Sequence, residues 1–248
     1  RPAPLSSTSS PTERNNAMIR EQISLSKYRI HSIQAGNTGP PAVLLHGLAG
    51  SSRWWQHTIP ELSRHYIVHA TELVGFGRSR PALDPFSIGE LSNVVREWLL
   101  IKQLKAVRLV GHSMGAQISV HVAADYPELV DRLVLVSASG VPRTISPREL
   151  TRFVAELIPP RAWGRPRFIP KIAADALRPG PRALLHATLG LLADDIVSHL
   201  KRITAPTLII WGEHDPLSPR GHANVIANAV KGSQIIVLKR VAHNPTVD

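Results

Sequence analysis

The stretch VRLVGHSMG, residues 107–115, has the pattern of a strand, a tight turn and the start of a helix. It begins with a short, largely apolar run, Val107–Val110, that is typical of a buried strand, and an apolar pattern of helical period starts at Met114. Between the two lies Gly-x-Ser-x-Gly, with Ser113 at its centre. At a tight strand-to-helix turn, the glycines avoid a collision of backbone and helix while the serine is held at the apex. The stretch therefore predicts an exposed serine nucleophile at the carboxyl end of a strand.

The same rhythm of apolar runs and helical patterns recurs along the chain. Further buried strands are predicted at Ala42–Leu45, Tyr66–Ala70, Leu133–Val136, Thr207–Trp211 and Ile235–Leu238. Helices are predicted at Trp54–Arg64, Ile88–Leu104, Met114–Tyr126 and Arg220–Val230. An antiparallel pair, Ile19–Leu25 and Tyr28–Ile33, precedes them. Strands that alternate with helices of this length indicate an α/β fold with a mostly parallel sheet flanked by helices.

Composition divides the chain into an arm, a core and an insertion. Residues 1–17 are rich in Pro, Ser and Thr, which predicts a flexible arm. Residues 18–139 and 201–248 carry the α/β pattern of the core. Residues 140–200 show helical pieces interrupted by eight prolines and no convincing strand. Because proline destabilises a helix interior, we expect short helices here, inserted after the sixth strand and lying over one end of the sheet.

A serine hydroxyl needs a base, and the base needs an orienting carboxylate. In a fold with this serine turn, the order is serine, acid, histidine, each after a strand. Asp215 follows the strand Thr207–Trp211, and His243 follows Ile235–Leu238. Glu213 is the alternative acid, but it lies nearer the strand, where side chains are committed to packing. We therefore assign Ser113, Asp215 and His243 as the catalytic candidates.

Attack by a serine nucleophile also needs an oxyanion hole, that is, two backbone N–H groups directed at the negative charge that develops on the substrate oxygen. One comes from the residue after the nucleophile, Met114. The second is expected in the glycine-rich loop HGLAGSS, residues 46–52, at Leu48, with Ala49 as the alternative.

Five segments together resemble an α/β-hydrolase fold serine hydrolase over nearly all of residues 18–248. They are HGLAGSSRWW (46–55), ELVGFGRS (72–79), GHSMG (111–115), TLIIWGEHDPLSP (207–219) and AHNP (242–245). The resemblance implies the same roles for the candidates above, with His243 as general base and acid. It also implies a structural role for His46 in the oxyanion loop.

The chain departs from the family pattern at two places. Glu72 stands where relatives usually place an aspartate, so its local role is expected to differ. The family usually continues past the catalytic histidine into a final helix, whereas five residues follow His243 in this sequence.

The resemblance also implies that the helical insertion is a lid whose apolar side chains shape the substrate pocket. Candidates for that lining are Phe153, Leu157, Trp163, Phe168, Leu177, Leu184, Leu185, Leu189 and Leu192. The alternative for each of them is that it only packs the lid onto the body.

Composition excludes several classes of protein. With 43% hydrophobic residues the chain is not disordered, and without cysteine it has no disulfide, thiolate metal site or cysteine nucleophile. The net charge of +11 is concentrated in the insertion, where residues 143–182 hold nine basic and three acidic residues. No basic stripe with aromatics accompanies it, so we expect a solvated basic lid and no nucleic-acid partner. No apolar run is long enough to span a membrane, and no leader is visible, which favours a cytoplasmic over a secreted protein.

These observations predict hydrolysis of a carboxylic ester or lactone through an acyl-serine intermediate, with no cofactor and no metal. The expected substrate is a small to medium, largely apolar ester-like molecule. Two enzyme alternatives are carbon–carbon bond hydrolysis of the meta-cleavage type and perhydrolysis, and a third alternative is a non-catalytic receptor or interaction module on the same fold. The sequence leaves the oligomeric state open.

Overall fold

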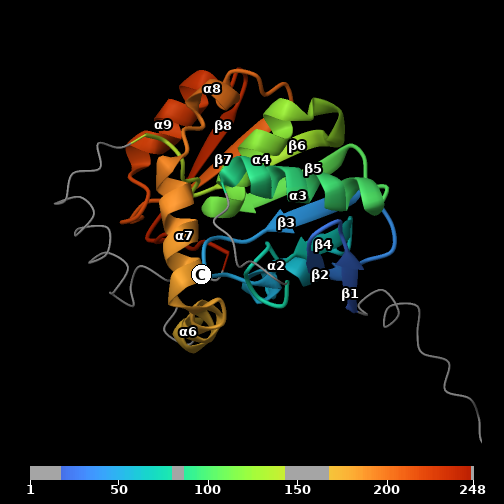
Figure 1. The fold of residues 1–248 in the computed structure, drawn as a ribbon. Coiled ribbons are helices and arrows are strands. Elements are labelled where there is room, and N and C mark those ends of the chain that lie inside the picture. Colours follow the sequence, from blue (N-terminus) through green and yellow to red (C-terminus); the bar gives the residue numbers. More distant parts are fainter. Residues whose placement is uncertain (1–17, 80–86, 143–167, 247–248) are drawn as a thin grey trace, which may run out of the picture.

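The computed structural model describes residues 18–79, 87–142 and 168–246. Eight strands form one sheet in the order β1-β2-β4-β3-β5-β6-β7-β8 (Figure 1). Their bounds are β1 Ile19–Ser24, β2 Arg29–Ala35, β3 Pro41–Leu45, β4 Ile67–Thr71, β5 Val107–His112, β6 Val130–Val136, β7 Thr207–Gly212 and β8 Gln234–Leu238. The pairs β1–β2 and β2–β4 are antiparallel, and the other neighbours are parallel. The predicted α/β class and mostly parallel sheet are confirmed.

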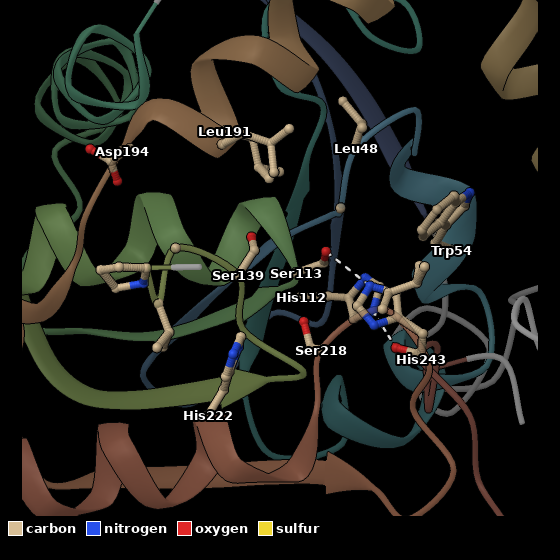
Figure 2. A pocket seen from close by; sticks show the side chains of 16 residues that line it. Leu48, Trp54, His112, Ser113, Ser139, Leu191, Asp194, Ser218, His222 and His243 are labelled. Atoms are coloured by element: carbon tan, nitrogen blue, oxygen red, sulfur yellow. Dashed lines mark hydrogen bonds between the residues drawn. The ribbon is translucent and has the colours of Figure 1, made fainter. Parts of the chain in front are cut away.

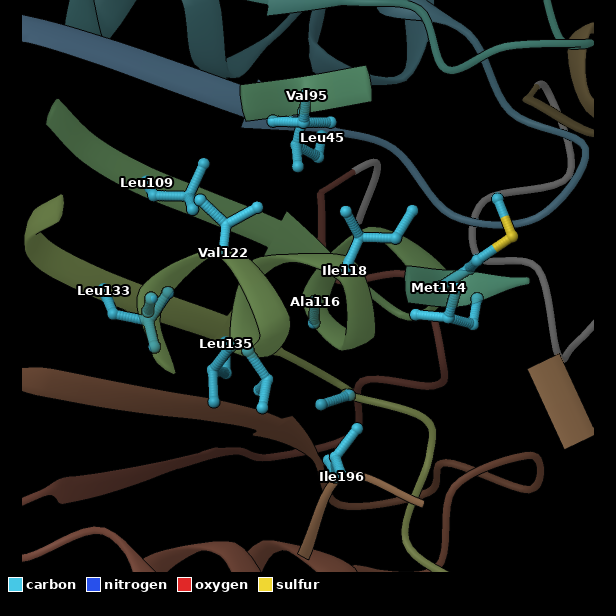
Figure 3. Packing of buried hydrophobic residues seen from close by; sticks show 14 of the residues in the cluster. Leu45, Val95, Leu109, Met114, Ala116, Ile118, Val122, Leu133, Leu135 and Ile196 are labelled. Atoms are coloured by element: carbon cyan, nitrogen blue, oxygen red, sulfur yellow. The ribbon is translucent and has the colours of Figure 1, made fainter. Parts of the chain in front are cut away.

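Helices cover the two faces of the sheet because the buried strands are apolar on both sides. Val43 and Leu45 of β3 join the main core with α3 (Ile88–Ile101) and α4 (Met114–Asp125). Ala42 and Leu44 face the opposite way and pack with Trp55 and Ile59. The helix α4 lies at the centre of the main core, where its apolar side chains meet those of β5 and β6 (Figure 3).

The predicted helix Trp54–Arg64 is wrong in its extent. The structure has a 3₁₀ helix, η1 (Ser52–Trp55), followed by a separate short helix, α2 (Thr58–Leu62). Pro60 gives the physical reason, since it has no N–H to bond the carbonyl of Gln56 and its ring would clash there. A continuous helix through this segment is therefore excluded.

The described part of the interval between β6 and β7 is helical. It contains α6 (Ile169–Leu177), α7 (Gly180–Ala193) and α8 (Val197–Leu200), and the helix α9 (Arg220–Ala229) follows β7. Pro170 and Pro181 lie in the first turns of α6 and α7, where a missing N–H costs little. The predicted arm, residues 1–17, and the lining candidates Phe153, Leu157 and Trp163 lie outside the described residues. Of the helices that the structure describes, none has the length and apolar character needed to cross a bilayer.

Candidate active site

Ser113 occupies a strained turn between β5 and α4. Its backbone has φ 51° and ψ −114°, in the positive-φ region that side chains rarely adopt. The flanking glycines permit this turn: a Cβ on Gly111 would lie 2.4 Å from the carbonyl oxygen of Gly115, and one on Gly115 would lie 2.4 Å from that of Leu45. The Gly-x-Ser-x-Gly spacing is thus required by close packing of α4 against the ends of β3 and β5.

The structure brings together the three side chains that the sequence singled out. The Oγ of Ser113 lies 3.0 Å from Nε2 of His243 (Figure 2). The Nδ1 of the same ring lies 2.9 Å from each carboxylate oxygen of Asp215. Because a carboxylate only accepts, Nδ1 carries a proton and donates it to Asp215, which leaves Nε2 free to accept the Ser113 hydroxyl proton.

Asp215 is fixed in position by its own loop. Its Oδ1 accepts the backbone N–H groups of Leu217 and Ser218, each at 2.9 Å. Burial alone would raise the pKa of Asp215, but the adjacent His243 ring and the hydrogen bond from Ser218 hold the pKa below its ordinary value. The alternative acid, Glu213, has a solvent-exposed side chain that accepts the N–H of Arg240 at 2.9 Å. Asp215, and not Glu213, therefore faces the histidine.

The glycine-rich loop after β3 lies against Ser113. A Cβ on Gly47 would be 3.2 Å from Cβ of Ser113, so glycine allows the loop this close an approach. Leu48 lines the pocket in front of Ser113, whereas Ala49, the alternative donor, takes a left-handed conformation with φ 60°. Met114 is the first residue of α4, where the backbone N–H has no acceptor within the helix.

His46 holds this loop through both ring nitrogens. Its Nε2 accepts the N–H of Leu73 at 3.0 Å, so Nδ1 carries the proton and donates it to the carbonyl of Gly47 at 2.8 Å. Burial lowers the pKa of His46, which keeps the ring neutral.

Glu72, the departure from the family pattern, also supports the loop. Its carboxylate accepts the hydroxyl of Ser52 at 2.7 Å and the N–H of Arg78, and it lies 3.4 Å from Nδ1 of His31. Burial would raise the pKa of Glu72, but these hydrogen bonds keep it below its ordinary value. The longer side chain is thus accommodated as a buried ionised acceptor between two loops.

A pocket of about 770 Å³, including the open space at its mouth, lies in front of Ser113. Its apolar lining in the described part of the chain is Leu48, Trp54, Val141, Pro142, Leu191, Leu192 and Leu217. Of the predicted lining residues, Leu192 lies in this wall, Phe168 packs against Trp54 behind it, and Leu184 packs against the main core.

Three lining predictions are wrong: Leu177, Leu185 and Leu189 are 81%, 57% and 55% exposed. Leu185 and Leu189 are one helical turn apart on one face of α7, while Ala187 and Leu191 form its buried face. The pattern of leucines alone did not indicate which face turns inward, and Leu191 was missed for that reason.

Three side chains among the described residues could offer metal ligands. They are His121, Asp125 and His199, whose candidate ligand atoms lie within 4.8 Å of one another. Asp125 is bonded to Arg202 at 2.6 Å and His121 to Asp194 at 3.0 Å. His121, Asp125 and His199 do not themselves line the Ser113 pocket, but Asp194, the partner of His121, does.

The geometry agrees with the comparison with known proteins. A family model described as alpha/beta hydrolase fold matches residues 40–194. The chain belongs to this family. It is 28% identical over 252 aligned residues to an uncharacterised protein of Mycobacterium tuberculosis, covering 88% of this chain and 74% of that one. The chain is also 28% identical to a pimeloyl-[acyl-carrier protein] methyl ester esterase of Vibrio vulnificus, and the alignment covers 86% of this chain and 91% of the esterase.

Among solved structures, the fold is similar to that of a putative lipase from Acinetobacter baumannii. The TM-score is 0.80 at 23% identity, covering 93% of this chain and 86% of the lipase. At this identity the likeness concerns the fold.

Proposed function

We propose that the protein hydrolyses carboxylic esters, lactones included, through an acyl intermediate on Ser113. The observation that carries the proposal is the series of hydrogen bonds from Ser113 through His243 to Asp215. Ser113 and His243 line a largely apolar pocket. A relative that is a methyl ester esterase supports the choice of ester over other acyl substrates.

The mechanism follows from the positions of these groups. As Oγ of Ser113 attacks the ester carbon, Nε2 of His243 takes the hydroxyl proton, and the ionised Asp215 stabilises the imidazolium. The N–H groups of Leu48 and Met114 stabilise the oxyanion. Collapse of the tetrahedral intermediate breaks the ester C–O bond, and His243 returns the proton to the leaving alcohol. Water, activated by the same ring, then hydrolyses the acyl-serine to release the acid.

The direct test compares two serine substitutions. Ser113→Ala should lower kcat/KM for short p-nitrophenyl esters by at least about a thousandfold because it removes the nucleophile. Ser24→Ala, on the exposed end of β1, should leave it unchanged. Normal turnover by Ser113→Ala would contradict the proposal.

The same preparation separates the alternatives. A ring-cleavage dienoate turned over faster than simple esters would favour carbon–carbon hydrolysis, and peracid formation from hydrogen peroxide would reveal perhydrolysis. Failure of a fluorophosphonate probe to label Ser113 in the folded protein would favour a binding function.

A further inference from the structure

Asp194, the residue that follows α7, lines the pocket on the opposite side from His243 (Figure 2). It is the centre of a polar network that extends behind the lining. The Oδ2 of Asp194 accepts the amide of Gln117 at 2.8 Å and the ring N–H of His121 at 3.0 Å. The proposed ester chemistry does not use this carboxylate.

Gln117 ties the network to the helix that carries Ser113. It is fully buried in α4, and its backbone N–H bonds the carbonyl of Ser113 at 3.0 Å. Its Oε1 accepts the hydroxyl of Ser139, another pocket residue, at 2.9 Å. A Cβ on Gly140 would lie 2.8 Å from the Gln117 amide, so the chain passes closely over it. The network therefore fixes the positions of Asp194 and Ser139 in the pocket wall.

The carboxylate is charged, and the described residues donate hydrogen bonds to only one of its two oxygens. Burial would raise the pKa of Asp194, but the hydrogen bonds from His121 and Gln117 hold it below its ordinary value. Both bonds end on Oδ2, so Oδ1 has no hydrogen-bond partner among the residues that the structure describes. The side chain is 19% exposed, and its neighbours in the wall include Leu191 and Leu192.

We propose that Asp194 forms the polar end of the substrate site and selects esters whose far end carries a hydrogen-bond donor, such as a hydroxyl or an amide N–H. The inference rests on the proposed function, because Ser113 fixes the position of the scissile bond. An apolar chain end would remove water from the carboxylate without replacing its hydrogen bonds, which is unfavourable. A chain end with a carboxylate would add repulsion between like charges.

The test uses three series of p-nitrophenyl esters, each with backbones from butanoate to octanoate. The chain ends in a methyl group, an ω-acetamido group or a carboxylate. At the best chain length, kcat/KM for the acetamido series should exceed that of the methyl series by about tenfold and that of the carboxylate series by more. Equal rates for the acetamido and carboxylate series would overturn the proposal.

Two neighbouring substitutions assign the selectivity to one side chain. Asp194→Asn removes the charge and should reduce the acetamido-over-carboxylate ratio by at least about tenfold. Asp195→Asn is the matched control, because Asp195 is exposed and lies outside the lining, and it should keep the wild-type ratio. An unchanged ratio in folded Asp194→Asn would also overturn the proposal, and if this variant fails to fold, the wild-type series decides.

Calorimetric binding to Ser113→Ala, with ethyl esters of the same three acids, distinguishes failure of the subsite from failure of the hydrolase function. Tighter binding of the acetamido ester without turnover by the wild type would keep the subsite and reject hydrolysis. Turnover by the wild type with no dependence on the chain end would support hydrolysis and reject the subsite.

Discussion

At the scale of single residues, His112 stands out because its ring contacts the backbone of His243, the proposed general base. Its Nε2–H donates to the carbonyl oxygen of His243 at 2.8 Å. Burial, aided by the neighbouring His243, lowers the pKa of His112 to about 3, so the ring is neutral and has a single N–H for this bond. We infer that His112 is a positioning residue that holds the loop of His243 at the correct distance from Ser113.

Replacing His112 tests this role. His112→Phe keeps an aromatic ring but loses the N–H, and we expect kcat/KM for esters to fall by about tenfold. His112→Gln, whose amide N–H can replace that of the ring, should restore most of the activity. Ester kinetics and unfolding in urea for both variants provide the measurement. Equal activity in the Phe and Gln variants would show that only packing matters at this position.

At the scale of elements, α6 is joined to the loop after β3 by a buried charge. Asp175 of α6 is fully buried, accepts the hydroxyl of Ser51 at 2.7 Å and pairs with Arg53. Phe168 and Ile172 pack beside this pair against Trp54 of the pocket wall. The pair therefore fixes the position of α6 beside the pocket.

Neutralising that pair should destabilise the protein. Asp175→Asn leaves Arg53 without its counter-charge, and we expect the free energy of unfolding to fall by about 1 to 3 kcal/mol. Glu61→Gln is the control, since Glu61 and Arg64 form an exposed pair with 66% of each side chain accessible, and it should change stability by less than about 1 kcal/mol. Urea unfolding of both variants measures the difference, and equal losses would refute a structural role for the buried charge.

Features of the helices and strands that depend on local sequence were predictable, whereas those that depend on distant contacts were not. The strands and the Ser113 turn were predictable because apolar runs and glycine spacing are local signals. The break near Pro60 is also a local signal, although the predicted helix Trp54–Arg64 runs through it. The roles of Asp175 and Asp194 were not predictable, because their partners Arg53 and Gln117 lie 122 and 77 residues away. The exposure of Leu185 and Leu189 was not predictable for a related reason, because the packing of α7 against the rest of the protein determines which of its faces is buried.

At the scale of the whole molecule, buried histidines link stability to pH. His31, His46, His69 and His112 are each less than 10% exposed, and burial lowers the pKa of all four. In the unfolded chain these rings bind protons below about pH 6.5. Because the folded state resists protonation, the unfolded state binds more protons as the pH falls, and the free energy of unfolding decreases. Stability should thus decline from about pH 6.5 towards pH 4.

His69 isolates one contribution to this decline. It lies in β4 with no hydrogen-bond partner for either ring nitrogen in the described chain, and burial, reinforced by Lys102, lowers its pKa to about 4. His69→Leu should therefore reduce the loss of unfolding free energy between pH 7 and pH 4 by on the order of 2 to 3 kcal/mol. The same substitution at the exposed His65 should leave the wild-type slope unchanged. Urea unfolding across this pH range measures both slopes, and a wild-type slope in His69→Leu would mean that His69 accepts its proton in the folded protein.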